Sequence, residues 1–275
     1  MEMTKETWRL ILHPPYDGAW NMAVDEAILE SVSSTNEPPT LRLYSWYPYA
    51  LSLGHVQPIS DVDLFELKRK GWSLVRRPTG GRAILHADEL TYSVSAPIDN
   101  PILKGNVIDS YKRISAALLS ALEFIGLKAD SKMKNPEDLQ LSKDPVCFQY
   151  PSDYEITFNG KKIIGSAQAR KKNGILQHGS IPLYGDISRI IEVLVLEENR
   201  KKESAKQNLN KHASTLQNAL GQFVSWSQMA DAVIHGFNKE LILEFNQSRL
   251  SQGEIKRAKE IYSGKYSHDS WTMRI

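Results

Sequence analysis

The sequence contains one cysteine, Cys147, and no long apolar run. A single thiol cannot form an intramolecular disulfide, which excludes a disulfide-stabilised secreted domain. The first 18 residues lack an apolar core followed by a small-residue cleavage site, and no window approaches the roughly 20 apolar residues of a membrane-spanning helix. We therefore expect a cytoplasmic protein without membrane contact, in which the thiol stays reduced.

An excess of charge of one sign is also lacking. The 34 Lys and Arg residues nearly balance the 32 Asp and Glu residues, so the formal net charge is only +2. This balance gives no support for a nucleic-acid partner, and we expect none. No Cys/His group has zinc-ligand spacing, so we expect no metal site, and HGS at 178–180 is not the GxSxG motif of a hydrolase.

What is present is an ordinary globular composition, with 41% hydrophobic and 24% charged residues. Runs of β-rich sequence are broken by a few helical patterns, which predicts an α+β fold with a mixed, largely antiparallel sheet and flanking helices. We expect a catalytic domain over residues 1–245 and a C-terminal helical extension over 246–275. The polar segment 128–146 is predicted to be a loop. Helices are expected at 20–32, 61–71, 107–125, 223–245 and 253–266, and strands at 40–46, 49–57, 73–86, 89–95, 154–168 and 173–183.

The dipeptide Asn159-Gly160 is the strongest turn signal in the chain. Both central residues of a type I′ turn need positive φ, which asparagine and glycine tolerate. A two-residue turn pairs Phe158 with Lys161 and Thr157 with Lys162, and it then pairs Ile156 with Ile163 and Glu155 with Ile164. The sequence therefore predicts a hairpin in which Lys162 lies on the same face as Glu155, Thr157 and Ser166.

The role of that face stays open at this point. An alternating strand is typical of a sheet with one solvated face, and it also fits the polar wall of a site that presents an ammonium group. Cys147 has two interpretations as well. Free cysteines are often buried and inert, whereas a neighbouring cation such as Lys162 would favour the reactive thiolate.

A glycine-bearing loop, RRPTGGRAILH, covers residues 76–86. Paired glycines let the backbone approach a ligand closely, and adjacent arginines suit a phosphate or a carboxylate. The loop is neither a P-loop nor a GxGxxG motif. By itself it could be only a turn between strands, and His86 could be only a structural residue.

Four motifs in order, RRPTGGRAILH, ELTYSVS, CFQYPSDYEI and GKKIIGSAQARKKNGILQHGSI, resemble those of the biotin/lipoate protein ligase superfamily. Within it the chain is most similar, over residues 20–275, to the LipM-type octanoyltransferases. The resemblance implies a biotin/lipoate ligase-like catalytic fold. It also implies transfer of octanoyl from octanoyl-acyl carrier protein to lipoyl domains of 2-oxoacid dehydrogenases or to the glycine cleavage H protein.

The resemblance also implies roles for particular residues. Cys147 would carry the acyl group as a thioester, and Lys162 would be the lysine of the family motif. Substrate-binding roles are implied for a second set: Arg76, Arg77, Gly80, Gly81, His86 and Ser166. Because one thioester is exchanged for another and then for an amide, no cofactor, no ATP and no metal would be required.

Two departures from the family pattern bear on this assignment. Arg82 stands where ligases that form an acyl-adenylate carry a third glycine, which favours a transferase. Ala87 stands where many relatives have an aspartate, and Asp88 follows it. The main alternatives are an ATP-dependent lipoate or octanoate ligase that works through acyl-AMP and an enzyme that passes octanoyl between lipoyl proteins.

The acidic carrier protein would need a basic surface on this chain. Two basic clusters, at 170–172 and 200–202, could guide its docking, although either could be only a solvated charged surface. We expect the protein to act as a monomer.

Overall fold

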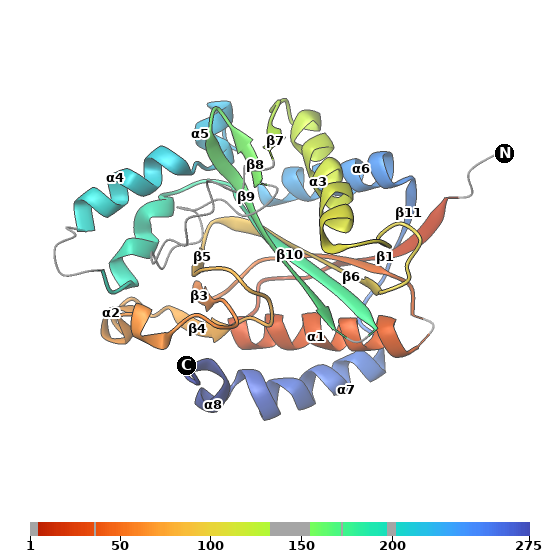
Figure 1. The fold of residues 1–275 in the computed structure, drawn as a ribbon, viewed down its shortest axis with the longest axis horizontal. Helices are drawn as coiled ribbons and strands as arrows, with labels where there is room; N and C mark the ends of the chain where they lie inside the picture. Colours follow the sequence, from red (N-terminus) through yellow and green to blue (C-terminus); the bar gives the residue numbers. More distant parts are fainter. Residues whose placement is uncertain (1–4, 36, 133–154, 172, 197–201) are drawn as a thin grey trace.

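The computed structural model describes residues 5–35, 37–132, 155–171, 173–196 and 202–275. Its centre is an eight-stranded mixed sheet with the strand order β11-β1-β2-β6-β10-β9-β8-β7 (Figure 1). The pairs from β2 through β6, β10, β9 and β8 to β7 are antiparallel, and β11-β1-β2 are parallel. The predicted α+β class is confirmed. The strands are β1 (Glu6–Leu12), β2 (Thr40–Tyr44), β6 (Glu89–Pro97), β7 (Asp130–Lys132), β8 (Glu155–Phe158), β9 (Lys161–Lys171), β10 (Gly174–Pro182) and β11 (Leu243–Gln247).

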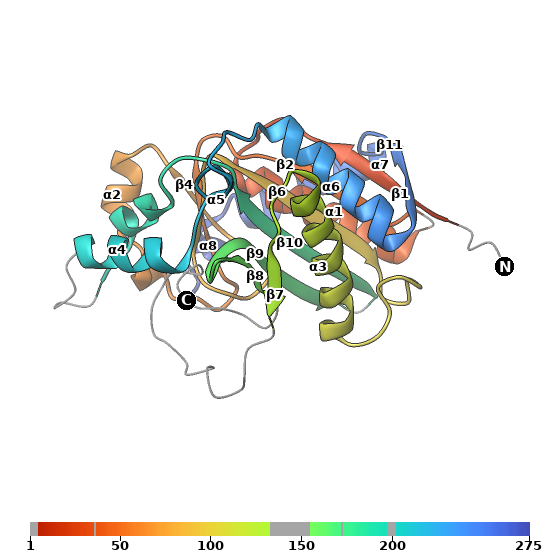
Figure 2. The ribbon, with the colours of Figure 1, turned by 90° about the horizontal axis from the view of Figure 1, so that it is seen from above.

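Helices cover both faces of this sheet (Figures 1 and 2). Helix α1 (Gly18–Ser34) packs on β6 and β10 and carries α7 (Gln252–Ile261) on its outer side. On the other face, α3 (Val107–Phe124) packs against α6 (Trp226–Leu241). Each layer buries its own set of apolar side chains, so the sheet separates two hydrophobic cores.

A smaller sheet lies beside the main one and carries the glycine-bearing loop. It is formed by β4 (Ser73–Arg76), β3 (Ala50–Leu53) and β5 (Ile84–His86), in that order. The loop joins β4 to β5, and helix α2 (Leu64–Arg69) precedes them. The remaining helical segments are η1 (Ile59–Asp61), η4 (Ile187–Val193), α4 (Lys202–His212), α5 (Leu216–Leu220), the π-helical η5 (Tyr262–Tyr266) and α8 (Asp269–Thr272). None of the helices in the described ranges is long and apolar enough to cross a membrane.

The β8-β9 hairpin forms at the predicted turn. Asn159 and Gly160 have φ values of +50° and +76°. Phe158 pairs with Lys161 and Thr157 with Lys162, as predicted, but Ile156 pairs with Ile164 because an irregularity shifts the register. The predicted pairs of Ile156 with Ile163 and of Glu155 with Ile164 are therefore wrong, since one extra residue in a bulge displaces all later partners.

Three strands were not expected from the sequence. Residues 130–132, predicted to be loop, form β7, and residues 133–146 of that segment lie outside the described ranges. The helix predicted to reach 245 ends at Leu241, where Ile242 adopts the left-handed conformation and β11 begins. Strand β11 then pairs with β1, which was also missed. Parallel pairing between the two ends of the chain is a tertiary event that local pattern does not encode.

The last 25 residues are tied to the N-terminal half. Glu254 of α7 accepts two hydrogen bonds from Arg9 of β1, at 2.9 and 2.5 Å. The indole of Trp271 donates to the backbone oxygen of Arg76 at 2.8 Å. The division between a domain at 1–245 and an extension at 246–275 stays a prediction.

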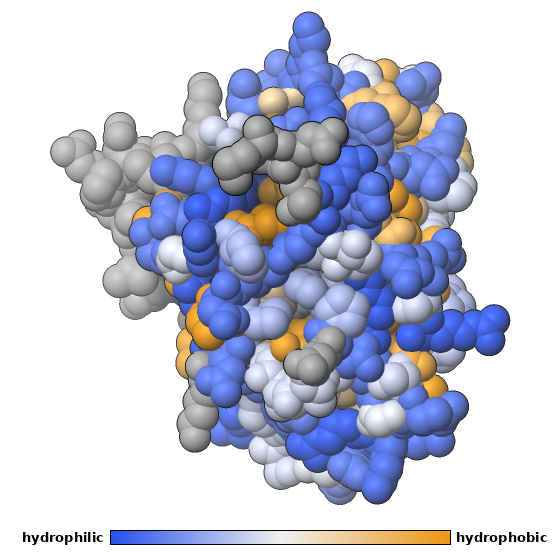
Figure 3. All heavy atoms as spheres, turned by 90° about the vertical axis from the view of Figure 1, so that its right-hand side faces the viewer, coloured by the Kyte–Doolittle hydropathy of each residue, from blue (hydrophilic) through white to orange (hydrophobic). Residues whose placement is uncertain are grey.

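One face of the molecule is shown in Figure 3. It is largely hydrophilic, and its hydrophobic residues appear in separated patches rather than in one broad area. Scattered exposed apolar side chains of this kind are normal for a folded protein. The described residues of this face therefore give no sign of a binding surface, and the cavities are the better candidates for a functional site.

Candidate active site

A mostly apolar cavity lies between α1, the small sheet and strands β6, β9 and β10. Four of the predicted site residues meet there: Arg77, Gly81, His86 and Ser166. Helix α1 and β2 contribute one lining residue each, Met22 and Tyr44, and the remaining lining residues are Trp46, Ser52, Ile84, Thr91, Gly165, Ala167, His178, Gly179 and Ser180. A largely apolar pocket with a few polar groups is the usual form of a small-ligand site.

His86 is buried and fixed at one wall of this cavity. Its ring stacks on Trp46 with centroids 3.9 Å apart and planes 15° apart. Its Nε2 lies 2.8 Å from the Ser52 hydroxyl, while the Trp46 indole donates to Thr91 at 2.8 Å. Because stacking and hydrogen bonding both restrain the ring, His86 presents a defined edge to the cavity.

Arg77 stabilises the conformation of the glycine-bearing loop through hydrogen bonds to the loop's own backbone. Its guanidinium donates to the backbone oxygens of Ser52, Gly80 and Arg82 at 2.9, 2.8 and 2.7 Å. Gly81 has a φ of +94°, and a Cβ built on Gly54 would lie 1.9 Å from the Gly81 oxygen. The loop therefore needs the glycines at 81 and 54 for its backbone conformation and for close approach.

Arg76 does not line the cavity. Its guanidinium donates to the backbone oxygens of Gly54, Gln57 and Thr272, at 2.9, 2.6 and 3.0 Å. These bonds join the segment after β3 to the C-terminal residues. Gly80 also lies outside the cavity lining. The substrate-binding roles of Arg76 and Gly80 stay predictions.

A buried polar chain that was not predicted connects α1 to the loop. Asp25 accepts hydrogen bonds from Arg42 at 2.7 Å and from the Tyr44 hydroxyl at 2.8 Å, and it lies 3.6 Å from Nδ1 of His178. His178 Nε2 lies 2.7 Å from the Thr79 hydroxyl. Its partners would orient the ring with Nδ1-H toward the carboxylate, so that Thr79 donates to Nε2.

The charge states along this chain follow from burial and pairing. Burial lowers the pKa of His178 below its ordinary value, which favours a neutral ring despite the nearby carboxylate. Burial acts to raise the pKa of Asp25, but Arg42 and His178 bring it below its ordinary value. The neutral His178 ring thus links the ionised Asp25 to the Thr79 hydroxyl, and both neighbours restrain its orientation. The only sequence signal for it was the HGS motif.

Lys162 is buried at the start of β9, with 3% of its surface exposed. Its ammonium lies 2.6 Å from the carboxylate of Glu155, which is also buried. A solvated sheet face is therefore wrong at these two positions. Cys147 lies outside the described residues, so its distance to Lys162 stays a prediction. Glu155 was not among the predicted site residues, although the hairpin register placed it on the same face.

Ser166 follows on the same strand and lines the cavity. Its hydroxyl accepts a hydrogen bond of 2.7 Å from Tyr92, whose own hydroxyl also accepts from Gln177 at 3.0 Å. Burial raises the pKa of Tyr92 to about 12, so Tyr92 stays a donor at neutral pH. Strand β9 thus carries both the buried ammonium group and part of the cavity wall.

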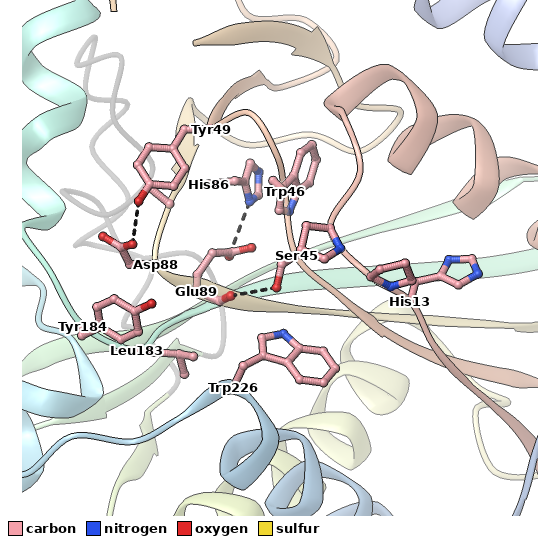
Figure 4. Close-up of a pocket in the computed structure, with 13 residues that line it drawn as sticks. His13, Ser45, Trp46, Tyr49, His86, Asp88, Glu89, Leu183, Tyr184 and Trp226 are labelled. Atoms are coloured by element: carbon pink, nitrogen blue, oxygen red, sulfur yellow. Dashed lines mark hydrogen bonds and ion pairs between the residues drawn. The ribbon is translucent and has the colours of Figure 1, made fainter. Parts of the chain in front are cut away.

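A second, open cleft of about 450 Å³ adjoins the cavity (Figure 4). Trp46 and His86 line both spaces. Asp88, next to the departure at Ala87, has a φ of +53° and accepts hydrogen bonds from Tyr49 at 2.7 Å and from Arg189 at 2.5 Å. The remaining lining residues are His13, Pro14, Pro15, Ser45, Glu89, Leu183, Tyr184 and Trp226.

The basic clusters are only partly described. Arg170 donates to backbone oxygens at the start of α3, those of Gly105 and Asn106, and Lys171 pairs with Glu26 at 2.7 Å. Position 172 and residues 200–201 lie outside the described ranges. A docking role for either cluster stays a prediction.

The α+β fold, the apolar cavity behind a glycine-bearing loop and the buried lysine on a strand of its wall define a protein with a site suited to a small, mostly apolar ligand. Residues 17–238 match the family described as the lipoyl protein ligase A/B catalytic domain. The chain therefore belongs to this family.

Individual relatives make the comparison more specific. The chain is 37% identical over 272 residues to an octanoyltransferase LipM of Carboxydothermus hydrogenoformans, covering 98% of this chain and 100% of the relative. It is 38% identical over 274 residues to an octanoyltransferase LipM of Staphylococcus aureus, covering 98% of this chain and 99% of the relative. The sequence resemblance to this group is confirmed.

Solved structures support the same fold. The bipartite lipoate protein ligase of Thermoplasma acidophilum, studied with its E2 lipoyl domain, superposes with a TM-score of 0.82 at 25% identity, covering 98% of this chain and 96% of its own. A lipoate-protein ligase A bound with ATP gives a TM-score of 0.78 at 25% identity, covering 97% and 98%. The fold is thus shared with ATP-using ligases and cannot by itself separate the two chemistries.

Proposed function

We propose that this protein moves octanoyl from octanoyl-acyl carrier protein to a lysine of a lipoyl domain, with Cys147 as the acyl carrier and Lys162 as the acid and base. Octanoyl transfer in protein lipoylation follows from the near full-length similarity to LipM octanoyltransferases. The donor, the acceptor and the route through a thioester are the proposal.

The observation that carries the proposal is the buried Lys162-Glu155 pair on the hairpin that follows Cys147. Lys162 and Ser166 are four residues apart on β9, which corresponds to about 13 Å along a strand. The lysine therefore lies at one end of a strand whose next residues line the acyl cavity. An acyl chain in that cavity could place its carbonyl carbon toward the lysine.

In the first half-reaction, the Cys147 thiolate attacks the thioester carbon of octanoyl-acyl carrier protein. The bond from carbon to the pantetheine sulfur breaks, and that sulfur takes a proton from the Lys162 ammonium. The products are an S-octanoyl cysteine and the carrier-protein thiol. A cation beside the thiol favours the thiolate before the attack.

In the second half-reaction, the neutral amine of the acceptor lysine attacks the S-octanoyl carbon. An amide bond forms, the carbon-sulfur bond to Cys147 breaks, and neutral Lys162 accepts the proton of the amine. One thioester is thus exchanged for another and then for an amide, so the sum of the two steps converts one donor thioester into one amide in a downhill direction. Neither half-reaction consumes ATP.

The apolar lining of the cavity would favour an acyl chain of a particular length. Each buried CH₂ group contributes about 0.8 kcal/mol, so an eight-carbon chain would gain several kcal/mol from the cavity without a polar contact. Arg76 and Arg77 of the loop donate hydrogen bonds to backbone oxygens, which supports a role for them in holding the conformation of the loop. We place the reaction in the reducing cytoplasm, where the Cys147 thiol persists, and expect the monomer to act alone.

The decisive experiment is intact-protein mass spectrometry after incubation with octanoyl-acyl carrier protein. We expect one octanoyl group on Cys147 in the wild-type protein and none in Cys147→Ala. A lipoyl domain added afterwards should remove the group and gain it on its lysine.

The rival is an ATP-dependent ligase, for which Cys147 would be incidental. Full activity of Cys147→Ala with ATP and free octanoate would sink the thioester route. The same loading assay with an octanoylated lipoyl protein as donor separates direct transfer from transfer between lipoyl proteins.

A further inference from the structure

The charged side chains that line the open cleft beside the acyl cavity are carboxylates, which bears on which of the two substrates of the proposed reaction could enter it. Among the described residues, its lining includes two carboxylates, Asp88 and Glu89, and no lysine or arginine. Its one histidine besides His86 is His13, whose pKa is lowered to about 4 mainly by burial, so His13 is neutral at physiological pH. Among the described lining residues the cleft therefore carries negative charge and no lysine or arginine, and Arg189, just outside the lining, offsets only Asp88.

The two carboxylates differ in how they are compensated. Asp88 pairs with Arg189 at 2.5 Å. Glu89 is buried, with 6% exposed, and its side chain accepts hydrogen bonds from the hydroxyls of Thr91 and Ser180. Within the described ranges, no lysine or arginine pairs with Glu89; only the His86 Nδ1 is close, at 3.4 Å. A buried carboxylate without a firm cation is costly, which indicates that a cationic ligand completes the site.

Two further polar atoms at this cleft make no hydrogen bond among the described residues. They are Nδ1 of His86, a side chain 5% exposed, and the indole Nε1 of Trp226. Both residues are drawn in Figure 4, with His86 above Glu89 and Trp226 below it. Buried polar atoms without a hydrogen bond are rare in folded proteins, and each calls for an explanation such as a catalytic role or a bound water or ion. The His86 Nδ1 has only the 3.4 Å approach to Glu89, so the Trp226 Nε1 is the clearer case of the two.

The other walls are suited to a thin alkyl arm. Four aromatic side chains line the cleft, those of Trp46, Tyr49, Tyr184 and Trp226, and Leu183 adds an aliphatic contact (Figure 4). Aromatic rings can pack along a methylene chain and also favour a cation at its end. Because Trp46 and His86 line both spaces, an arm in the cleft ends at the wall of the acyl cavity.

We propose that this cleft binds the aminobutyl arm of the acceptor lysine, with Glu89 facing its ammonium group and taking one proton from it, so that the neutral amine then attacks the S-octanoyl carbon. The inference rests on the proposed function, since it assigns the acceptor subsite of the same reaction. The pantetheine arm of the donor is the competing occupant. That arm carries a phosphodiester, which is disfavoured by a cleft whose described lining residues include two carboxylates and no lysine or arginine.

The test separates the two half-reactions. Glu89→Gln keeps the size of the side chain and removes its charge. We expect the rate of Cys147 octanoylation from octanoyl-acyl carrier protein to stay within about twofold of wild type. The half-saturating lipoyl-domain concentration in the second half-reaction should rise by about tenfold or more, as loss of one charged hydrogen bond predicts.

Glu254→Gln is the matched control. Glu254 is a buried carboxylate on α7 that pairs with Arg9 and does not line the cleft. It should lower stability without changing either half-reaction. Trp226→Phe is a second test variant that removes a donor with no partner, so it should fold normally and still weaken lipoyl-domain use.

Small probes test the charge directly. N-acetyl-lysine amide should inhibit transfer from preloaded octanoyl-enzyme to the lipoyl domain, and N-acetyl-norleucine amide, which lacks the amine, should not. Equal inhibition by both, or by neither, would overturn the assignment. Slower loading in Glu89→Gln with unchanged transfer would assign the cleft to pantetheine instead. If wild-type protein acquires no octanoyl on Cys147, the proposed function fails before the cleft is tested.

Discussion

Removing the Lys162 ammonium should damage both stability and chemistry, and the two effects can be separated. Lys162 and Glu155 are each about 95% or more buried and lie 2.6 Å apart. Breaking a buried ion pair by removing one partner typically costs about 3–5 kcal/mol, because the remaining charge loses its compensation. We expect Lys162→Met to lower the free energy of unfolding by this amount in urea titration.

A second substitution should restore stability. Replacing a whole buried pair by apolar residues of similar size is often neutral or stabilising by about 1–4 kcal/mol. The double variant Lys162→Met/Glu155→Leu should therefore regain most of the loss. It should not regain activity, because the acid and base group is still missing.

The kinetic expectation follows from the role of Lys162 in proton transfer. Removing a general acid or base slows the chemical step by about 10²- to 10⁴-fold. The rate of Cys147 octanoylation should fall by this factor in both the single and the double variant, while the KM for the donor changes little. Rapid-quench mass spectrometry would measure both quantities.

Ile163→Ala is the control for stability alone. Ile163 is fully buried next to the lysine, and its truncation should cost about 2–5 kcal/mol without touching a titratable group. It should acylate at the wild-type rate under conditions where it is folded. The reasoning is refuted if Lys162→Met unfolds within 1 kcal/mol of wild type, or if the double variant acylates normally.

Two further predictions concern the loop and the pH dependence. Gly54→Ala should impair octanoyl loading and lower the melting temperature, because its Cβ would meet the Gly81 oxygen, whereas Gly264→Ala meets nothing within 4 Å and should load normally. Burial acts to raise the pKa of Glu26, but hydrogen bonds from Lys171 and Lys265, with others, lower it to about 2. Stability from this depressed pKa is present above pH 4.5 and lost as pH falls to about 2, on the order of 3 kcal/mol. Urea midpoints of Glu26→Gln should show a smaller loss across that window, and an unchanged pH profile would contradict the assignment.

The β8-β9 hairpin shows which features of a fold can be predicted from local sequence and which cannot. Asn159-Gly160 predicted the turn and the pairing of Thr157 with Lys162, because the turn geometry depends only on the residues that form it. The register failed at the next pair, that of Ile156, where a bulge intervenes. A bulge responds to the packing of both faces of the hairpin, and that packing involves distant segments.

The sequence by itself determined most of the local elements, with β1, β7 and β11 as the exceptions, and it also determined the family. The glycine-bearing loop, the helix from 107 and the fold class were all within reach of pattern and motif. Their physical basis is local, since backbone freedom at glycine and apolar periodicity act over a few residues.

The tertiary structure decided what the polar residues do. Asp25, Thr79 and His178 are far apart in the chain and form one buried network, and Lys162 gains Glu155 as its partner inside the protein. Whether a charged side chain is solvated or buried depends on which distant segments cover it, and that is settled only when the sheets and helices pack together.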